Sequence, residues 1–307
     1  MRNVYTYNDF KKVDLLKALL NFSNKKEYIS VLVSNLDGKE SSLPKDYINY
    51  DIIAGIGKSD VFISNHDSFE KLKIFYKNKR DWLFGYLSYD LKNEIEDLNS
   101  DNIDNFNADN MSFFIPEYVL LLKNDQLQIE TYHSKYKCDK FVRELDFSNL
   151  LHSVVDVEFS RRVDKEVYLQ TVNKIKTHIQ RGDIYELNYC QEFYSNEPKI
   201  LPEVIFFELN ELMQTPFSSF LKLKDKYILS VSPERFLRKK GNHVLSQPIK
   251  GTKKRGINKS EDKILINELN ISQKDISENI MIADLVRNDL SINATKESVN
   301  VDELCKV

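Results

Sequence analysis

Residues 247–256 combine a lysine, a glycine and a threonine in a pattern that could do chemistry. Lys250 stands between Ile249 and Gly251, at the end of a stretch that alternates as a β-strand does. A lysine held there on fixed backbone becomes a nucleophile only when its amine is neutral, which requires desolvation or a neighbouring positive charge. Gly251 leaves room for a ligand to approach the backbone, and Thr252 adds a small donor and acceptor. The alternative interpretation is a strand that ends in a basic surface turn.

A second candidate is a carboxylate on the predicted last helix, residues 272–290. This range has apolar residues at helical spacing and begins with Ser272 and Asp275, a pair that resembles a capping box. Glu278 shares a face with mostly apolar residues, and burying a lone carboxylate is costly. We therefore expect either a salt bridge, for example to Arg287, or an oxygen-seeking ion such as Mg²⁺.

Length and composition narrow the classes of function. The chain has 307 residues, enough for one large domain or two ordinary ones, and its 44 basic and 47 acidic residues give a net charge of -3. This balance argues against binding nucleic acid through overall charge. Three widely spaced cysteines suggest neither a disulfide framework nor a metal site, which fits a reducing cytoplasm. The sequence predicts no membrane span and no signal peptide.

The first half of the chain is predicted to alternate helices and strands. The expected helices are one capped by Asn8 and one over residues 69–76. The expected strands are 28–34, 51–57, a strand over 82–89 buried on both faces, and a hairpin of 118–123 with 126–131. Residues 99–110, rich in Asp and Asn, should form an exposed loop.

A polar stretch between Tyr132 and Val154 suggests a boundary, which divides the chain into regions 1–153 and 154–307. In the second region we expect a helix from Asp164 to Gly182 with His178 packed on its apolar face, a strand over 184–193 and a helix over 202–213. Two hairpins should follow, 218–223 with 227–231 and 236–239 with 243–247. Four successive strands followed by helices indicate an antiparallel sheet covered on one side, an α+β fold.

Five blocks of the sequence together resemble the chorismate-utilising enzymes, and among these component I of aminodeoxychorismate synthase. The blocks are 82–90, 181–188 with Gln191, 232–237, 248–252 and 278–290. They cover most of the chain from Trp82 onward. The resemblance implies a two-lobed α+β fold with central antiparallel sheets and outer helices, chorismate as substrate and Mg²⁺ as cofactor.

The residue at position 250 distinguishes subclasses of that family. Anthranilate synthases normally have alanine there, whereas the matching lysine of aminodeoxychorismate synthases is described as a covalent nucleophile. The resemblance therefore implies that Lys250 adds to C2 of chorismate as the C4 hydroxyl leaves. Ammonia would then attack C4 and give 4-amino-4-deoxychorismate, a precursor of 4-aminobenzoate and folate.

The resemblance also implies roles for other residues. Glu234 would be an acid or base for the leaving hydroxyl, or else a structural carboxylate, and Glu278 would be a Mg²⁺ ligand. Gly251, Thr252 and Gln191 would contact the substrate. Gln191 stands where the water-adding members have a lysine, which favours ammonia as the nucleophile. The basic residues 253–255 could attract the chorismate dianion, or form a solvated turn.

The resemblance implies a glutamine amidotransferase subunit as the source of ammonia. Two alternatives stay open: anthranilate synthase component I, and a truncated, non-catalytic remnant that binds chorismate or the amidotransferase. The second arises because the family's chains continue past the position of Val307 with further Mg²⁺ ligands, so the C-terminal part of the fold is expected to be missing. Residues 214–218 only approximate the amino-acid regulatory pocket of anthranilate synthases, which predicts no feedback by tryptophan.

Overall fold

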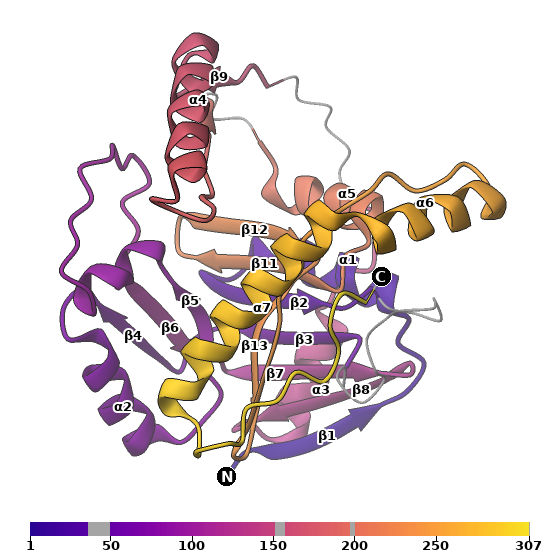
Figure 1. The fold of residues 1–307 in the computed structure, drawn as a ribbon. Coiled ribbons are helices and arrows are strands. Elements are labelled where there is room, and N and C mark those ends of the chain that lie inside the picture. Colours follow the sequence, from indigo (N-terminus) through magenta and orange to yellow (C-terminus); the bar gives the residue numbers. More distant parts are fainter. Residues whose placement is uncertain (36–49, 151–156, 197–199, 307) are drawn as a thin grey trace. The chain divides into compact units, whose positions relative to one another are not determined.

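The computed structural model describes residues 1–35, 50–150, 157–196 and 200–306. The chain forms two compact units: the larger comprises Met1–Leu150 with Phe206–Val307, and the smaller comprises residues 151–205 (Figure 1). No helix in these ranges is both long and apolar enough to cross a membrane.

A seven-stranded antiparallel sheet lies at the centre of the larger unit, in the order β1-β8-β7-β3-β2-β11-β12 (Figure 1). Nearly every residue of β2, β3 and β7 is buried, which explains their continuous apolar runs. Helix α1 packs against β2, and Phe141 of α3 stacks on Tyr118 of β7. The bounds are β1 (Asn3–Tyr7), α1 (Lys12–Ser23), β2 (Tyr28–Val33), β3 (Ile52–Ile56), β7 (Tyr118–Lys123), β8 (Gln126–Thr131), α3 (Lys135–Arg143), β11 (Phe217–Leu223) and β12 (Lys226–Ser232).

A three-stranded sheet, in the order β4-β6-β5, packs against the large one. Phe84 and Phe114 of the small sheet share a buried cluster with Tyr28, Leu121 and Leu221 of the large sheet. The core of the unit therefore lies between the two sheets, and α2 flanks β4. The bounds are β4 (Asp60–Ser64), α2 (Ser68–Lys79), β5 (Phe84–Leu87), the 3₁₀ helix η2 (Tyr89–Glu94) and β6 (Met111–Ile115).

Two expectations for the first half are wrong. The stretch 82–89 is not a strand buried on both faces: β5 is a short strand at the edge of its sheet, and Leu87 is 51% exposed. Asn8 does not cap α1, which begins at Lys12. Residues before it form β1, and the Asn8 side chain instead accepts a hydrogen bond from Gln126. The other expected elements, including the exposed loop over 99–110, are confirmed.

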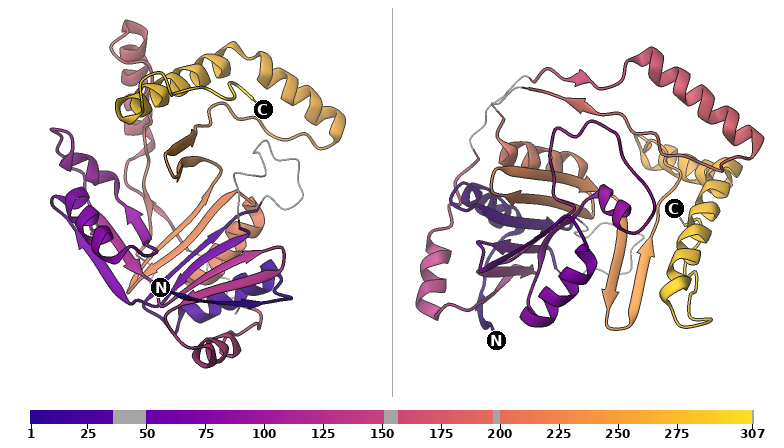
Figure 2. Two further views of the ribbon diagram at one scale, coloured as in Figure 1. Left: turned by 90° about the horizontal axis from the view of Figure 1, so that it is seen from below. Right: turned by 90° about the vertical axis from the view of Figure 1, so that its left-hand side faces the viewer.

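The last third of the chain begins with two hairpins that do not share a sheet. β11 and β12 join the large sheet, whereas β13 (Arg235–Lys240) and β14 (His243–Gln247) form a separate two-stranded ribbon (Figure 2). The expected single four-stranded sheet is therefore wrong. Helices α6 (Lys259–Ile271), which the sequence did not predict, and α7 (Gln273–Asn293) follow, and neither has a fully buried residue. Strands of both predicted regions, 1–153 and 154–307, share the large sheet, and that division stays a prediction.

The smaller unit contains α4 (Lys165–Arg181) and the short pair β9 (Ser160–Arg161) and β10 (Phe193–Tyr194). Helix α4 ends at Gly182, as predicted. The expected strand over 184–193 is wrong, since only its last residue is paired and Tyr189 instead stacks on Tyr168 of α4. His178 is not packed on an apolar face: it is exposed, with Nδ1 2.8 Å from Asp183 Oδ2. Helix α5 (Pro202–Met213) runs from this unit into the larger one.

Candidate functional site

The β13–β14 ribbon fixes the backbone that leads to Lys250. Arg235 Nε donates a hydrogen bond of 2.8 Å to Gln247 Oε1, which joins the two strands at the base of the ribbon. The Arg235 guanidinium also lies 4.6 Å from the ring centroid of Phe217, on β11. Burial and the nearby Arg238 lower the pKa of Arg235. Gln247, three residues before Lys250, is therefore attached through Arg235 to the large sheet.

Glu234 and Lys250 lie at the same end of this ribbon. The backbone N–H of Ile249 donates to Glu234 Oε2 over 3.4 Å, so the carboxylate reaches the residue next to the lysine. The Lys250 side chain is half-buried, and Glu234 is exposed. The structure thus brings together the two residues that the sequence singled out as catalytic, and their roles stay predictions.

Gly251 must be a glycine for two reasons. Its φ of 77° lies in the left-handed region, which side chains other than glycine rarely adopt. A Cβ at this position would also lie 2.9 Å from Cβ and 3.0 Å from Oδ1 of Asp275, in the first turn of α7. The backbone after Lys250 therefore runs directly against α7, and the adjacent Thr252 is exposed.

We expect Gly251→Ala to destabilise the protein by about 1–3 kcal/mol, because it combines backbone strain with a clash. Gly241→Ala is the matched control: Gly241 has a φ of 59°, and no atom of the described residues lies within 4 Å of the position that a Cβ would take, so the substitution should cost only the strain, about 1 kcal/mol. Urea unfolding of the two variants measures the difference. Equal losses of unfolding free energy in the two variants would show that Asp275 does not constrain the segment around Gly251.

Glu278 forms a salt bridge, one of the two outcomes expected from the sequence, but its partner is not Arg287. Its Oε1 lies 3.4 Å from Lys274 Nζ, one turn earlier on α7, and the side chain is half-buried. The suggested partner, Arg287, instead pairs with Asp284, with 2.6 Å between Nη2 and Oδ1. Each pair joins residues three or four positions apart, which are neighbours on a helix surface.

The ligands that Mg²⁺ requires can be compared with the residues found around Glu278. Mg²⁺ requires near-octahedral oxygen coordination, usually with one or two protein carboxylates. In the ranges that the structure describes, no three His, Cys, Asp or Glu residues gather where they could hold a metal. Glu278 alone, paired with Lys274, does not make a complete site. The role of Glu278 as a ligand stays a prediction, and no chemical step below depends on Mg²⁺.

Gln191 lies in the smaller unit, whereas the other predicted site residues all lie in the larger one. Its Nε2 donates to the carbonyl oxygen of Val163 over 2.8 Å, which fixes the orientation of the amide. The amide oxygen is buried and accepts no hydrogen bond from the described residues. A buried acceptor without a donor is costly, so this oxygen is available to a ligand or a water molecule.

Helix α6 binds the basic segment that follows Thr252. Arg255 donates from Nε and Nη2 to the two carboxylate oxygens of Asp262, over 2.8 and 2.5 Å, and Lys253 forms an ion pair with Glu268. Two of the three basic residues proposed to attract a dianion are thus engaged by α6. The sequence signal that was missed is Asn258 with Glu261 three positions later, a pair typical of a helix start. Asn258 indeed caps α6.

The Arg255–Asp262 pair gives a pH prediction. Hydrogen bonds from Arg255 and from the Gly256 backbone lower the pKa of Asp262 from 3.8 to about 2. The pair therefore stabilises the segment above pH 3.8, and this contribution is lost as the pH falls through about 2. We expect Arg255→Gln to raise the Asp262 pKa, measured by NMR titration of its carboxyl carbon, and Lys254→Gln to leave it unchanged. An unaltered pKa in Arg255→Gln would contradict this pairing.

Comparison with known proteins places the chain in a family. Residues 45–307 match the chorismate binding enzymes. This match covers most of the chain, which therefore belongs to that family.

Named relatives fall into two subclasses. The chain is 32% identical over 231 residues to an anthranilate synthase component I-like protein of Synechocystis, a match that covers 74% of this chain and 47% of the relative. It is 29% identical over 222 residues to aminodeoxychorismate synthase component 1 of Escherichia coli, covering 72% and 49%. The chain thus spans about half the length of the curated relatives it matches.

Solved structures show the same fold. Anthranilate synthase component I from Streptococcus pneumoniae superimposes with a TM-score of 0.65 at 16% identity, over 84% of this chain and 65% of that chain. The menaquinone-specific isochorismate synthase from Escherichia coli gives 0.61 at 12% identity, over 95% and 64%. The α+β fold expected from the sequence is therefore the fold of these enzymes.

Proposed function

We propose that the chain is component I of an aminodeoxychorismate synthase, which converts chorismate and ammonia to 4-amino-4-deoxychorismate. The observation that carries this proposal is the placement of Lys250, on a segment held by the β13–β14 ribbon on one side and by Asp275 on the other. Membership in the chorismate binding family supports the substrate class. Relatives named aminodeoxychorismate synthase component 1, from Escherichia coli at 29% identity and Bacillus subtilis at 27%, support the subclass.

In the proposed reaction, the neutral Lys250 amine forms a bond to C2 of the chorismate ring as the C4 hydroxyl departs. Glu234 is the proposed acid, which protonates this hydroxyl so that it leaves as water. Ammonia then attacks C4, and the bond between C2 and the lysine breaks to restore the free amine. Two successive displacements keep the substituent at C4 and retain its stereochemistry, whereas one direct displacement would invert it.

The remaining predicted residues would position the substrate. The Gly251 N–H and the Thr252 hydroxyl follow the nucleophile directly and could donate to a chorismate carboxylate. Gln191 would contact the substrate through its buried amide oxygen, and Glu278 would supply one ligand to Mg²⁺. Ammonia would come from a glutamine amidotransferase subunit, in the cytoplasm.

Anthranilate synthase component I is the second candidate. Identities of 32% to the Synechocystis protein and 33% to anthranilate synthase component 1 of Bacillus pumilus favour it. Lys250 opposes it, because a nucleophile on the enzyme is not needed when ammonia adds directly to the ring.

Intact-mass analysis of the chain incubated with chorismate, without ammonia, tests the proposal. The expected adduct has the mass of chorismate less one water and maps to Lys250 in a peptide digest. Ammonia should then release the adduct as 4-amino-4-deoxychorismate. Fluorescent anthranilate formed from chorismate and ammonia without an adduct would favour the second candidate. Neither adduct nor product would favour a non-catalytic chain that binds chorismate or the amidotransferase.

A further inference from the structure

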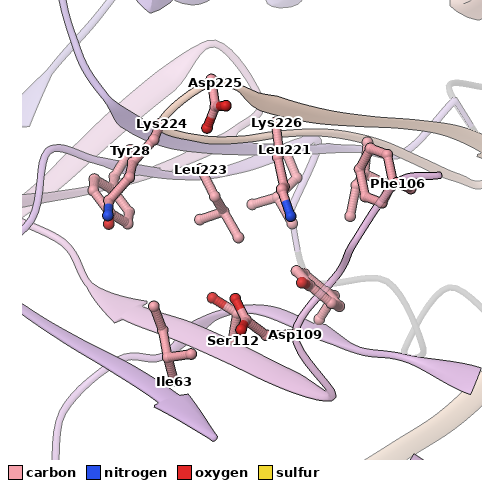
Figure 3. Close-up of a pocket in the computed structure, with 12 residues that line it drawn as sticks. Tyr28, Ile63, Phe106, Asp109, Ser112, Leu221, Leu223, Lys224, Asp225 and Lys226 are labelled. Carbon is pink, nitrogen blue, oxygen red and sulfur yellow. The ribbon is translucent and has the colours of Figure 1, made fainter. Parts of the chain in front are cut away.

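A pocket of about 180 Å³ lies between the two sheets of the larger unit (Figure 3). Its apolar walls include Leu221 and Leu223 of β11 and Ile63 of β4. None of the residues that the sequence singled out for catalysis or substrate binding lines it. The proposed function therefore does not account for this pocket.

The volume limits the size of a ligand. An apolar cavity of about 150 Å³ in a protein can hold a benzene molecule. A pocket of about 180 Å³ is therefore large enough for one six-membered ring with small substituents. Side chains from both sheets line it, so a flat ring could lie between the Leu223 side and the Ile63 side (Figure 3).

The side of the pocket formed by the turn between β11 and β12 carries Lys224, Asp225 and Lys226, so its net charge is positive. Lys226, the first residue of β12, directs its ammonium group into the pocket (Figure 3). The group donates a hydrogen bond to the carbonyl oxygen of Asn107 and lies 5.4 Å from the ring centroid of Phe106. These contacts hold the ammonium in place without neutralising it, and within the described ranges Lys226 has no ion-pair partner. A ligand carboxylate would complete its coordination.

The opposite side of the pocket carries hydrogen-bond acceptors. Asp109 and Ser112 lie across the pocket from Lys226 (Figure 3). Asn65 Nδ2 donates to Asp109 Oδ1 over 3.0 Å, which orients the carboxylate. A carboxylate has lone pairs for several donors, so Asp109 can accept a further hydrogen bond from an amino or hydroxyl group on a ligand.

We propose that this pocket binds a monocyclic carboxylate whose ring bears an amino or hydroxyl group. The carboxylate binds Lys226, the ring lies between Leu223 and Ile63, and the donor faces Asp109. Opposite charges at the two sides fix the orientation of the ligand, and the apolar walls between them select a ring. The proposal is independent of the proposed function, because it involves neither Lys250 nor the turnover of chorismate.

Isothermal titration of the whole chain with 4-aminobenzoate, benzoate and aniline tests the proposal. Benzoate lacks the amino group and aniline lacks the carboxylate. We expect 4-aminobenzoate to bind about tenfold more tightly than either, because each of the others loses one charge-assisted hydrogen bond. Absence of saturable binding of 4-aminobenzoate would overturn the proposal.

Variants locate the binding site. Lys226→Met should remove the preference for 4-aminobenzoate over aniline, and Asp109→Asn should remove the preference over benzoate. Lys226→Gln is the second variant if Lys226→Met does not fold, as judged by circular dichroism. Lys239→Met, on the β13–β14 ribbon, and Lys250→Ala should bind 4-aminobenzoate as the wild type does. Unchanged binding to both Lys226 variants, or binding lost in Lys250→Ala, would refute the assignment to this pocket.

Discussion

Lys250→Ala is expected to abolish the covalent adduct with chorismate and to lower the rate of chorismate amination by about 10³-fold or more. Alanine cannot form the bond to C2, so ammonia would have to displace the C4 hydroxyl directly. The segment that carries position 250 is fixed by contacts of the Arg235 and Gly251 positions, which do not involve the lysine amine. The fold should therefore survive the substitution, and intact mass with a stopped assay for 4-amino-4-deoxychorismate measures the effect.

Lys254→Ala is the matched control for Lys250→Ala. It removes the same charge four residues later, on the exposed stretch before α6. The comparison distinguishes a nucleophile from a positive charge that only attracts the chorismate dianion. If Lys250 is the nucleophile, Lys254→Ala should retain the adduct and most of the rate of amination. Comparable losses in both variants would indicate an electrostatic role for Lys250. Ammonia-dependent anthranilate formation by Lys250→Ala would show that this residue determines the subclass.

The sequence predicted local structure well where a few neighbouring residues determine it. Asn124 and Asp125 both adopt positive φ, at 49° and 61°, as the tight turn between β7 and β8 requires. Gly241 has the same role between β13 and β14, with a φ of 59°. Ser272 caps α7 as its sequence suggests. Each of these features depends on residues within four positions of one another.

Pairing between distant strands could not be predicted in the same way. Nothing in the sequence around Phe220 shows that β11 pairs with β2, where Phe220 lies opposite Val31. The same limit explains why one four-stranded sheet was expected from two consecutive hairpins. The stretch 184–192 alternates like a strand, but Tyr189 stacks on Tyr168, and among the residues that the structure describes no strand pairs with it.

The candidate site was predictable as a set of residues, but not as a set of contacts. Lys250, Gly251 and Glu234 were singled out by type and order, and the structure brings them to one end of the ribbon. The pairing of Arg255 with α6 depends on a close approach at Gly256, where a Cβ would lie 2.3 Å from the Asp262 nitrogen. Such an approach is a property of the folded backbone and leaves no periodic signal.

A buried ion pair near the N-terminus underlies the largest expected effect on stability. Arg2 donates from Nε and Nη2 to both oxygens of Asp81, over 2.8 and 2.9 Å, and the side chains are only 6% and 7% exposed. Arg2 also donates to the carbonyl oxygens of Pro116, Glu117 and Glu130. One guanidinium thus joins the start of β1 to segments that are far apart in the sequence.

We expect Arg2→Met to lower the free energy of unfolding by about 3–5 kcal/mol at pH 7, because it leaves the Asp81 carboxylate buried without its partner. Lys11→Met is the control, since the Lys11–Asp125 pair is 67% and 48% exposed and, as a solvent-screened surface pair, should contribute little to stability. Urea unfolding measures both. A loss below about 1 kcal/mol in Arg2→Met would mean that water or another donor replaces the guanidinium.

Measurements at acid pH distinguish the contribution of the Asp81 charge to stability from that of the packed Arg2 side chain. Burial alone would raise the Asp81 pKa, but Arg2, the Trp82 N–H and the Tyr132 hydroxyl together hold it below 3.8. The stability that this depressed pKa provides is present above pH 3.8 and is lost as the pH falls through the lower, folded-state value. In Arg2→Met the Asp81 carboxyl should protonate at higher pH, because burying the neutral acid costs less free energy than burying the carboxylate. The difference in unfolding free energy between wild type and variant should therefore narrow on acidification. If it stays constant, the stabilisation comes from the three carbonyl contacts and the packed side chain rather than from the ion pair.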